Sequence, residues 1–260
     1  MIIGAQLYSV RVKCQNNDDI RSTFRALKEM GYDSVQVSGF PYNAAEVRSA
    51  ADEFGLHIGL THTAPADIIN KTDEVIENHK ILGADVVGVG GAFGIYVDKE
   101  TGRIKIEEFM KDMAPAVEKL EAAGLRFAFH NHFKEFEDYG GYNIMDLLFE
   151  KTNWLFTFDT GWAHYAGTDV LALIEKYKDR LQYVHLKDFR KAETEGESPS
   201  SLIAPLYSGA VPVNEIIKKL IEVGTVKVAY VEQDNASDAA DPIGEMKKSA
   251  DGLKANGWIK

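Results

Sequence analysis

The sequence predicts an α/β fold that consists of a single (β/α)8 TIM barrel, and three observations support this prediction. Short apolar segments alternate with longer amphipathic segments along the whole chain, as expected for strands connected by helices. The apolar segments number eight. The length of 260 residues is typical of one such barrel, so we expect residues 1–260 to form a single domain.

The expected strands are short and rich in apolar and β-branched residues. Strands that alternate with helices form parallel sheets with right-handed crossovers, and eight such units favour closure into a barrel. In chain order the expected strands are Ile2–Leu7, Ser34–Val37, His57–Leu60, Asp85–Val89, Arg126–His130, Leu155–Asp159, Gln182–Leu186 and Lys227–Glu232.

The segments between these strands carry apolar residues at intervals of three and four, which predicts amphipathic helices. Glycines at the expected helix ends suit a left-handed cap that turns the chain into the next strand. The expected helices are Ile20–Met30, Ala44–Phe54, Ala66–Leu82, Ile106–Ala123, Val170–Tyr177 and Val213–Val223. The capping glycines are Gly31, Gly55, Gly83, Gly124 and Gly224.

An open, doubly wound sheet is the competing fold. It is disfavoured because no G-x-G-x-x-G phosphate-binding fingerprint follows the first strand. The glycine-rich segment Gly88–Gly94 departs from that spacing, so we interpret it as a tight loop that approaches another group closely. The polar segment Lys191–Ser201 follows the seventh strand, where it is either a mobile surface loop or a lid.

The composition excludes several classes of partner. The net charge is −11 and no basic patch interrupts it, so we expect no nucleic-acid partner. No apolar segment reaches the roughly 18–20 residues that span a bilayer, and the first residues do not resemble a signal peptide. The single cysteine, Cys14, has no partner for a disulfide, which fits a reducing compartment. We therefore expect a soluble cytoplasmic protein without a membrane partner.

Polar and ionisable residues gather at the carboxyl ends of the expected strands, where the active sites of barrels lie. Four of the seven histidines are among them. Two of these, His130 and His132, have one residue between them and so point to the same face of a strand. The strand-end residues are Gln6, Tyr8, His62, His130, His132, Asp159, His185, Lys187 and Glu232.

Four of these residues form a candidate metal site. His130, Asp159, His185 and Glu232 end the fifth to eighth strands, which are neighbours in a barrel. Imidazoles and carboxylates are ligands for Mn, Co, Zn or Mg, so we expect one divalent metal ion as the cofactor. Each residue also has a structural explanation on its own, as a turn cap, a salt-bridge partner or a core histidine. Their joint placement at consecutive strand ends favours the metal.

Several motifs resemble the xylose isomerase-like sugar isomerase/epimerase barrels, a group related to inosose dehydratases and hydroxypyruvate isomerases. The resemblance covers nearly the whole chain, with the motifs in the right order. The motifs are Gly4-Ala-Gln-Leu-Tyr-Ser-Val-Arg11, His130-Asn-His-x-x-Glu-Phe-Glu137, Phe158-Asp-Thr-Gly-Trp162, Val184-His-Leu-Lys-Asp188 and Val231-Glu-Gln-Asp234.

The resemblance implies one divalent metal at the ends of strands five to eight, on the same four residues. Many relatives carry a glutamate where this chain has His130, which leaves a substrate-binding role open for that residue. The resemblance places His132 near the reacting carbon, and Trp162 suits stacking on a sugar ring. Relatives often have a Gly-Glu-Gly segment after the seventh strand, whereas this chain has Leu206–Pro212.

The expected reaction is isomerisation or epimerisation of a ketose or related polyol through an enediolate that a metal stabilises. We expect His132, Glu232 and Lys187 to be catalytic, and Gln6, Tyr8, His62 and Trp162 to bind the substrate, a small carbohydrate. One alternative is a dehydratase or lyase that eliminates from a keto-sugar, keto-glycoside or keto-cyclitol. Another is a non-catalytic sugar-binding barrel. Aromatic residues in the expected loops leave a homo-oligomer open.

Overall fold

The computed structural model describes residues 1–91 and 102–260, and it contains an eight-stranded parallel sheet. The strands are β1 (Ile2–Gln6), β2 (Ser34–Gln36), β3 (Leu60–His62), β4 (Val86–Val89), β5 (Arg126–His130), β6 (Leu155–Asp159), β7 (Leu181–Leu186) and β10 (Val228–Val231). Their order in the sheet is β2-β1-β10-β7-β6-β5-β4-β3. Two parallel bridges, Ser34 with His57 and Val37 with Thr61, join β2 to β3 and close the ring. The predicted TIM barrel is confirmed.

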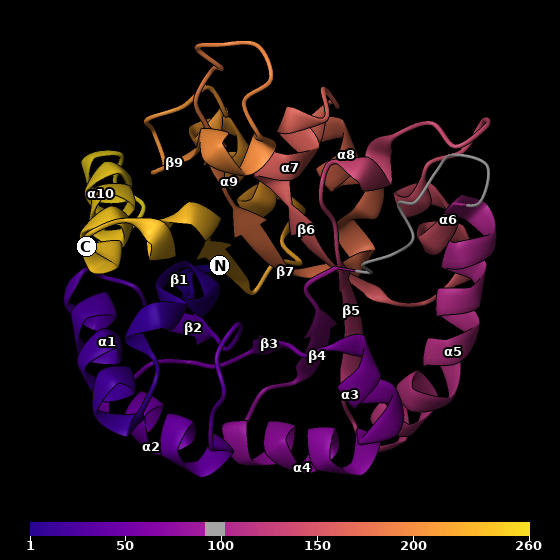
Figure 1. The fold of residues 1–260 in the computed structure, drawn as a ribbon, viewed down its shortest axis with the longest axis horizontal. Coiled ribbons are helices and arrows are strands. Elements are labelled where there is room, and N and C mark those ends of the chain that lie inside the picture. Colours follow the sequence, from indigo (N-terminus) through magenta and orange to yellow (C-terminus); the bar gives the residue numbers. More distant parts are fainter. Residues whose placement is uncertain (92–101) are drawn as a thin grey trace.

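Helices surround the strands on the outside of the barrel (Figure 1). They are α1 (Asn17–Glu29), α2 (Ala44–Phe54), α3 (Pro65–Asn70), α4 (Thr72–Leu82), α5 (Gly102–Ala122), α6 (Ile144–Lys151), α7 (Thr160–Tyr165), α8 (Val170–Tyr177), α9 (Val213–Val223) and α10 (Pro242–Ala255). None of the helices in the described ranges is both long and apolar enough to cross a membrane. A short antiparallel hairpin of β8 (Asp188–Phe189) and β9 (Ile203–Ala204) follows β7.

The core has two parts. The larger part lies between the strands and the helices, and the smaller part is a separate cluster of side chains from the strands alone. Because successive side chains on a strand point to opposite faces, this second cluster fills the interior of the barrel. Its members are Leu60, Val86, Ala128, Leu155, Tyr183, Val228 and Tyr230. A packed interior leaves only the ends of the barrel for a site.

The expected helices over α2, α8 and α9 are confirmed with the same bounds. The five capping glycines all have positive φ, as expected. The helix expected over Ile20–Met30 begins earlier, because the side chain of Asn16 caps α1 by accepting a hydrogen bond from Asp19 N. The expected α5 also begins earlier, at Gly102.

Two expectations about the elements were wrong. The helix expected over Ala66–Leu82 is divided into α3 and α4, because Lys71 has a non-helical backbone with φ −132° and ψ 35°. The third strand was expected over His57–Leu60 but occupies Leu60–His62. An added Cβ at Gly59 would overlap the ring of Tyr183. The space beside the segment before β3 is therefore occupied by the Tyr183 side chain from the barrel interior.

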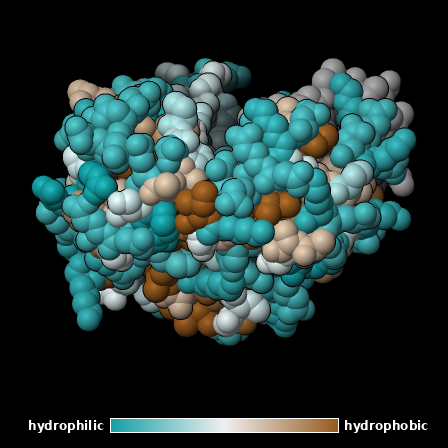
Figure 2. All heavy atoms as spheres, turned by 90° about the horizontal axis from the view of Figure 1, so that it is seen from below, coloured by the Kyte–Doolittle hydropathy of each residue, from teal (hydrophilic) through white to brown (hydrophobic). Residues whose placement is uncertain are grey.

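Two helices, α6 and α7, were not among the expected segments. The outer surface is mostly hydrophilic on the face that Figure 2 shows, with separate small hydrophobic patches. A homo-oligomer stays a prediction.

Candidate active site

The period of two along the strands places the ionisable side chains directly above the packed interior. On β7, Tyr183 belongs to the interior cluster, and His185 lies two residues further along the same face. On β10, Tyr230 belongs to that cluster and Glu232 follows two residues later. His130 on β5 and Asp159 on β6 follow Ala128 and Leu155 in the same phase. The barrel therefore carries four imidazole and carboxylate side chains at its carboxyl end.

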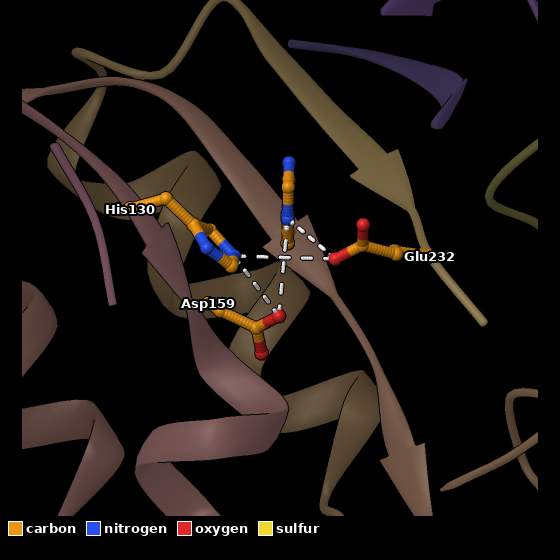
Figure 3. Close-up of side chains that lie close together, drawn as sticks. His130, Asp159 and Glu232 are labelled. Atoms are coloured by element: carbon orange, nitrogen blue, oxygen red, sulfur yellow. Dashed lines mark ion pairs between the residues drawn. The ribbon is translucent and has the colours of Figure 1, made fainter. Parts of the chain in front are cut away.

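These four side chains converge. One potential ligand atom from each of His130, Asp159, His185 and Glu232 lies within 4.8 Å of the others, and all four residues are buried. The Nδ1 atom of His185 is 2.8 Å from Glu232 Oε2, and His130 Nε2 is 3.5 Å from Asp159 Oδ2. Figure 3 shows His130, Asp159 and Glu232 pointing toward a common centre from different strands. We call this group the four-residue cluster.

Both histidines of the cluster are oriented from behind. His185 Nε2 is 2.7 Å from Gln36 Oε1, and His130 Nδ1 is 3.2 Å from the carbonyl oxygen of Gly90. Because these oxygens accept, the ring nitrogens that contact them donate. The opposite nitrogens, His185 Nδ1 and His130 Nε2, are then the ones that face the centre. Outer hydrogen bonds of this kind orient metal-binding histidines.

Lys187 is fully buried beside the cluster. Its Nζ atom lies 3.0 Å from Asp159 Oδ2, 3.0 Å from Glu232 Oε2 and 2.7 Å from Asp234 Oδ2. Burial opposes the charge of Lys187, but the three carboxylates raise the pKa of its ammonium well above the ordinary value. Three carboxylates thus face one lysine, and with His185 neutral, as metal binding requires, a divalent cation would balance the two excess negative charges.

The buried atoms of the cluster fit a metal ion. His130 Nε2, Asp159 Oδ2, His185 Nδ1 and Glu232 Oε2 have no partner with hydrogen-bond geometry in residues 1–91 and 102–260. These four atoms contact one another and Lys187 Nζ only as ion pairs, so a cation bound among them would satisfy all four. Burial opposes the charge on His185, but the Glu232 and Asp159 carboxylates raise its pKa to about 9. The ligand roles themselves stay predictions.

Two cavities lie above the cluster. The inner chamber has a volume of about 160 Å³ and is lined by Tyr8, Ser38, His62, Gly90, His130, His132, Glu232 and Asp234. The outer chamber has a volume of about 470 Å³ and is lined by Tyr8, Arg11, His132, Phe133, Trp162, Pro199, Ser200, Asp234, Asn235 and Asp238. The expected strand-end residues Tyr8, His62 and His132 therefore border the space directly above the cluster.

Burial keeps the two remaining imidazoles neutral. It lowers the pKa of His132 to about 3, and it lowers the pKa of His62 well below the ordinary value. His62 Nδ1 lies 3.5 Å from Gln6 Nε2. Gln6 is itself fully buried and accepts a hydrogen bond from Tyr8 N, so it supports the wall of the site and does not line either chamber.

Trp162 lies in an aromatic group at the side of the outer chamber. Its ring centre is 4.8 Å from that of Phe189 and 5.6 Å from that of Phe133. The Nζ atom of Lys187 is 5.0 Å from the Trp162 ring. Trp162 is also positioned by Asp159, whose Oδ1 accepts a hydrogen bond from Trp162 N and caps α7. Asp159 thus caps a helix with one oxygen and turns the other to the cluster.

Two segments of uncertain role are placed by the structure. The segment Lys191–Ser201 lies between β8 and β9, and its residues Pro199 and Ser200 border the outer chamber. In the segment Gly88–Gly94, an added Cβ at Gly88 or Gly90 would crowd the His62 side chain. The close approach expected there is thus found at these two glycines, while residues 92–94 lie outside the described residues.

Sequence reasoning missed several supporting residues. Gln36 on β2 orients His185, and Asn131 exchanges two hydrogen bonds with the backbone of Asp159 at 2.9 and 3.2 Å. Asp188 accepts hydrogen bonds from the backbone nitrogens of Gly209 and Val211, which holds the segment Leu206–Pro212 in place. A polar side chain inside an apolar strand was the available signal for Gln36.

Comparisons with known proteins agree with this fold. The model of the xylose isomerase-like TIM barrel family matches residues 24–256. The chain is 35% identical over 97 residues to an inosose dehydratase of Clostridium perfringens, a match that covers 34% of this chain and 32% of that protein. The match therefore spans only about a third of the length of that relative. The rhizopine catabolism protein MocC of Rhizobium meliloti is 22% identical over 262 residues, which covers 87% of this chain and 78% of that protein.

Solved structures share the fold. A sugar phosphate isomerase/epimerase from Parabacteroides distasonis has a TM-score of 0.76 at 20% identity and covers 99% of both chains. The probable 3-DHS dehydratase AsbF from Bacillus anthracis has a TM-score of 0.74 at 14% identity, over 98% of this chain and 99% of that one. The family model covers most of the barrel and the last four strands with their cluster. The chain therefore belongs to the xylose isomerase-like TIM barrel family.

Proposed function

We propose that this chain is a divalent-metal-dependent enzyme that moves a proton at the carbon next to a carbonyl group of a carbohydrate or cyclitol. The observation that carries the proposal is the four-residue cluster. It sets two imidazole nitrogens and two carboxylate oxygens around one point, directly beneath a chamber lined by Tyr8, His62 and His132.

His130, Asp159, His185 and Glu232 would hold one Mn, Co, Zn or Mg ion, which would supply Lewis-acid polarisation of the carbonyl group. The residues of the chain supply the other functions. Tyr8 and His62 line the inner chamber and orient the hydroxyl groups of the substrate. Lys187, a buried ammonium 3.0 Å from Asp159 and from Glu232, favours the negative charge that develops on the substrate oxygen.

Glu232 and His132 are the two candidate bases. Both line the inner chamber, so a substrate carbon held there lies within reach of both. Either residue removes the proton and leaves an enediolate. Return of the proton to the neighbouring carbon completes an isomerisation, and its return to the opposite face completes an epimerisation. This first outcome requires no leaving group on the substrate.

Elimination is the second candidate outcome, and the relatives that are named inosose dehydratases favour it. The base takes the proton from the α-carbon, the bond from the β-carbon to its oxygen breaks, and the leaving oxygen takes a proton. The products are water and an unsaturated ketone. His132 borders both chambers, and as a neutral imidazole it is placed to accept the α-proton and pass that proton to the leaving oxygen. A keto-cyclitol or keto-sugar fits this outcome.

Metal content and proton exchange together test the proposal. Protein purified without added metal is expected to hold about one divalent ion per chain, and Glu232→Gln is expected to lose it. The exposed Glu29→Gln at the end of α1 is the matched control and should retain the metal. Ketoses and inososes are then followed by NMR in D2O. Glu232→Gln should exchange the α-proton roughly 10²–10⁴ times more slowly than the wild type.

The outcomes separate the candidates. Deuterium at the α-carbon with a new ketose supports isomerisation or epimerisation, and loss of water from an inosose supports elimination. Absence of metal from the wild type after dialysis against Mn would contradict the metal-dependent mechanism. Unchanged sugar affinity after chelation, with no exchange, would favour a non-catalytic sugar-binding barrel.

A further inference from the structure

The inner and outer chambers form one site with two compartments. They share three lining residues, Tyr8, His132 and Asp234. The inner chamber is lined by both candidate bases, His132 and Glu232, and by His130 of the four-residue cluster. The outer chamber is lined by no residue of the four-residue cluster, so the residues that line it alone serve binding and not proton transfer.

The two volumes differ in a way that limits the substrate. Since a water molecule occupies about 30 Å³ in the liquid, the inner chamber of about 160 Å³ has room for one sugar-sized ring. The outer chamber, at about 470 Å³, is larger than the inner chamber. A free monosaccharide that reacts in the inner chamber would leave the outer chamber filled with water.

The walls of the outer chamber suit a ring. Tyr8, Phe133 and Trp162 present aromatic surface, on which sugar and aromatic rings pack. The guanidinium of Arg11 lies 4.0 Å from the centre of the Tyr8 ring, and Arg11 also donates to the carbonyl oxygens of Tyr8 and Asp234 at 2.7 and 3.1 Å. These contacts hold the polar rim in place before a ligand binds.

The segment that precedes β9 borders the outer chamber and not the inner one. Pro199 and Ser200, which precede β9, line only the outer chamber. Asn235 fastens this segment by donating to the carbonyl oxygens of Ser200 and Ile203 at 3.3 and 2.8 Å. A loop held by hydrogen bonds therefore borders a compartment that the reacting ring does not occupy.

We propose that the substrate has two rings, with the reacting keto-ring in the inner chamber and a second ring, joined to it by a glycosidic bond, in the outer chamber. This inference rests on the proposed function, because the proposed chemistry decides which chamber holds the reacting ring. The substrate class is then a keto-glycoside or keto-disaccharide.

The test compares two ligands that differ only in the second ring. Cellobiose with one ketone on its non-reducing ring is the two-ring ligand, and methyl glucoside with the same ketone is the one-ring ligand. Calorimetry with Mn-loaded full-length protein is expected to give about tenfold tighter binding of the two-ring ligand. Ser200→Trp fills the outer chamber from an exposed position and should abolish that preference. Thr194→Trp, an exposed change in the same segment away from the chamber, should retain it.

Equal affinity of the wild type for the two ligands would overturn the inference, as would a Ser200→Trp variant that weakens both ligands equally or a wild type that binds neither. Proton exchange is measured on the same samples. A two-ring preference that Ser200→Trp removes, without any α-proton exchange, would support the outer chamber and contradict the proposed function. Exchange of the α-proton with both ligands, bound at equal affinity, would support the proposed function and contradict the two-ring substrate.

Discussion

Gln36 shows how a residue outside the four-residue cluster can control it. Gln36 lies on β2 and is fully buried, and its side-chain oxygen is 2.7 Å from His185 Nε2. The contact joins residues that are 149 positions apart in the chain. It fixes the ring of His185 so that Nδ1 faces Glu232 and Asp159. The proposed metal ligand thus depends on a neutral amide that does not reach the centre.

We expect Gln36→Leu to weaken metal binding by about 10–100-fold, because the His185 ring loses the acceptor that orients it. Competition with a chelator of known affinity measures the effect on Mn or Zn. Gln36→Glu is the matched control, since it keeps an oxygen acceptor at the same position and should retain most of the affinity. Equal affinity of Gln36→Leu and the wild type would contradict an orienting role.

His185 also predicts how metal binding depends on pH. The carboxylates raise its pKa to about 9, so a metal that binds His185 Nδ1 below that pH must displace a proton. We expect the affinity to fall by about tenfold for each pH unit between 9 and 7, with the release of about one proton per ion. Calorimetry in buffers of different ionisation enthalpy measures the proton release. A dissociation constant that is independent of pH in this range would contradict the expectation.

The raised pKa of His185 also affects the free energy of unfolding of the metal-free protein. A folded-state pKa above the ordinary 6.5 means that the charged His185 stabilises the fold fully below pH 6.5, and that this contribution is lost as the pH rises through about 9. Chelated protein should therefore lose free energy of unfolding between pH 6.5 and 9. A curve that rises over that interval would contradict the assignment.

The strand-end residues were predictable from the sequence, and their supports were not. His130, Asp159, His185 and Glu232 could be found because each follows an apolar segment and because parallel strands end at one edge. Gln36 and Gly90 reach the cluster only after the barrel has closed and its register is set. No local pattern in the sequence specifies the register in which the strands of the barrel pair.

At the scale of elements, β3 shows where the interior overrides local pattern. The apolar run His57–Leu60 predicted a strand, yet β3 begins only at Leu60. Tyr183 on β7 lies against Gly59, and its hydroxyl donates to Asp85 at 2.5 Å. The side chain of one strand therefore occupies the space in which a side chain of the third segment would stand.

We expect Gly59→Ala to destabilise the barrel by about 1–3 kcal/mol, because the new Cβ overlaps the Tyr183 ring inside a packed core. Denaturant unfolding measures the change. In the double variant Gly59→Ala/Tyr183→Leu, the two losses should sum to more than the observed loss, since the smaller side chain removes the overlap. Additive losses would show that Gly59 is required for another reason.

The outer helices were easier to predict than their breaks. α2, α8 and α9 each carry apolar residues at helical spacing, and these residues are buried on one face of the helix. Their bounds agree with expectation. The break between α3 and α4 at Lys71 follows no glycine or proline, so nothing local announced it. α7 begins directly after Asp159, which acts as its N-cap, so the turn cap considered for this residue and its place in the four-residue cluster occur together.

At the scale of the whole molecule, the proposed metal would cross-link the barrel. β5, β6, β7 and β10 are consecutive in the sheet, and each carries or directly precedes one residue of the four-residue cluster. The alternation of strands and helices predicted this neighbourhood, because right-handed crossovers place sequential strands side by side. Only the closure through β2 and β3 then brings the walls of the chambers around the cluster.

A ligand that joins four strands of the native barrel and is absent from the unfolded chain must stabilise the fold. At a free metal concentration of about 100 times the dissociation constant, the expected gain in free energy of unfolding is about 2.7 kcal/mol. For a domain of this size that gain corresponds to an increase in Tm of about 5–10 °C. Thermal unfolding with Mn and with excess chelator measures it.

Glu232→Gln supplies the control for this stabilisation, because the variant keeps the barrel but loses one carboxylate of the cluster. Its Tm should be the same with Mn and with chelator, whereas the Tm of Glu29→Gln should respond as in the wild type. The comparison separates a specific ion between β5 and β10 from general binding of Mn to the acidic surface, which carries a net charge of −11. An equal response of wild type and Glu232→Gln would assign the stabilisation to that surface and leave the four-residue cluster without its proposed ion.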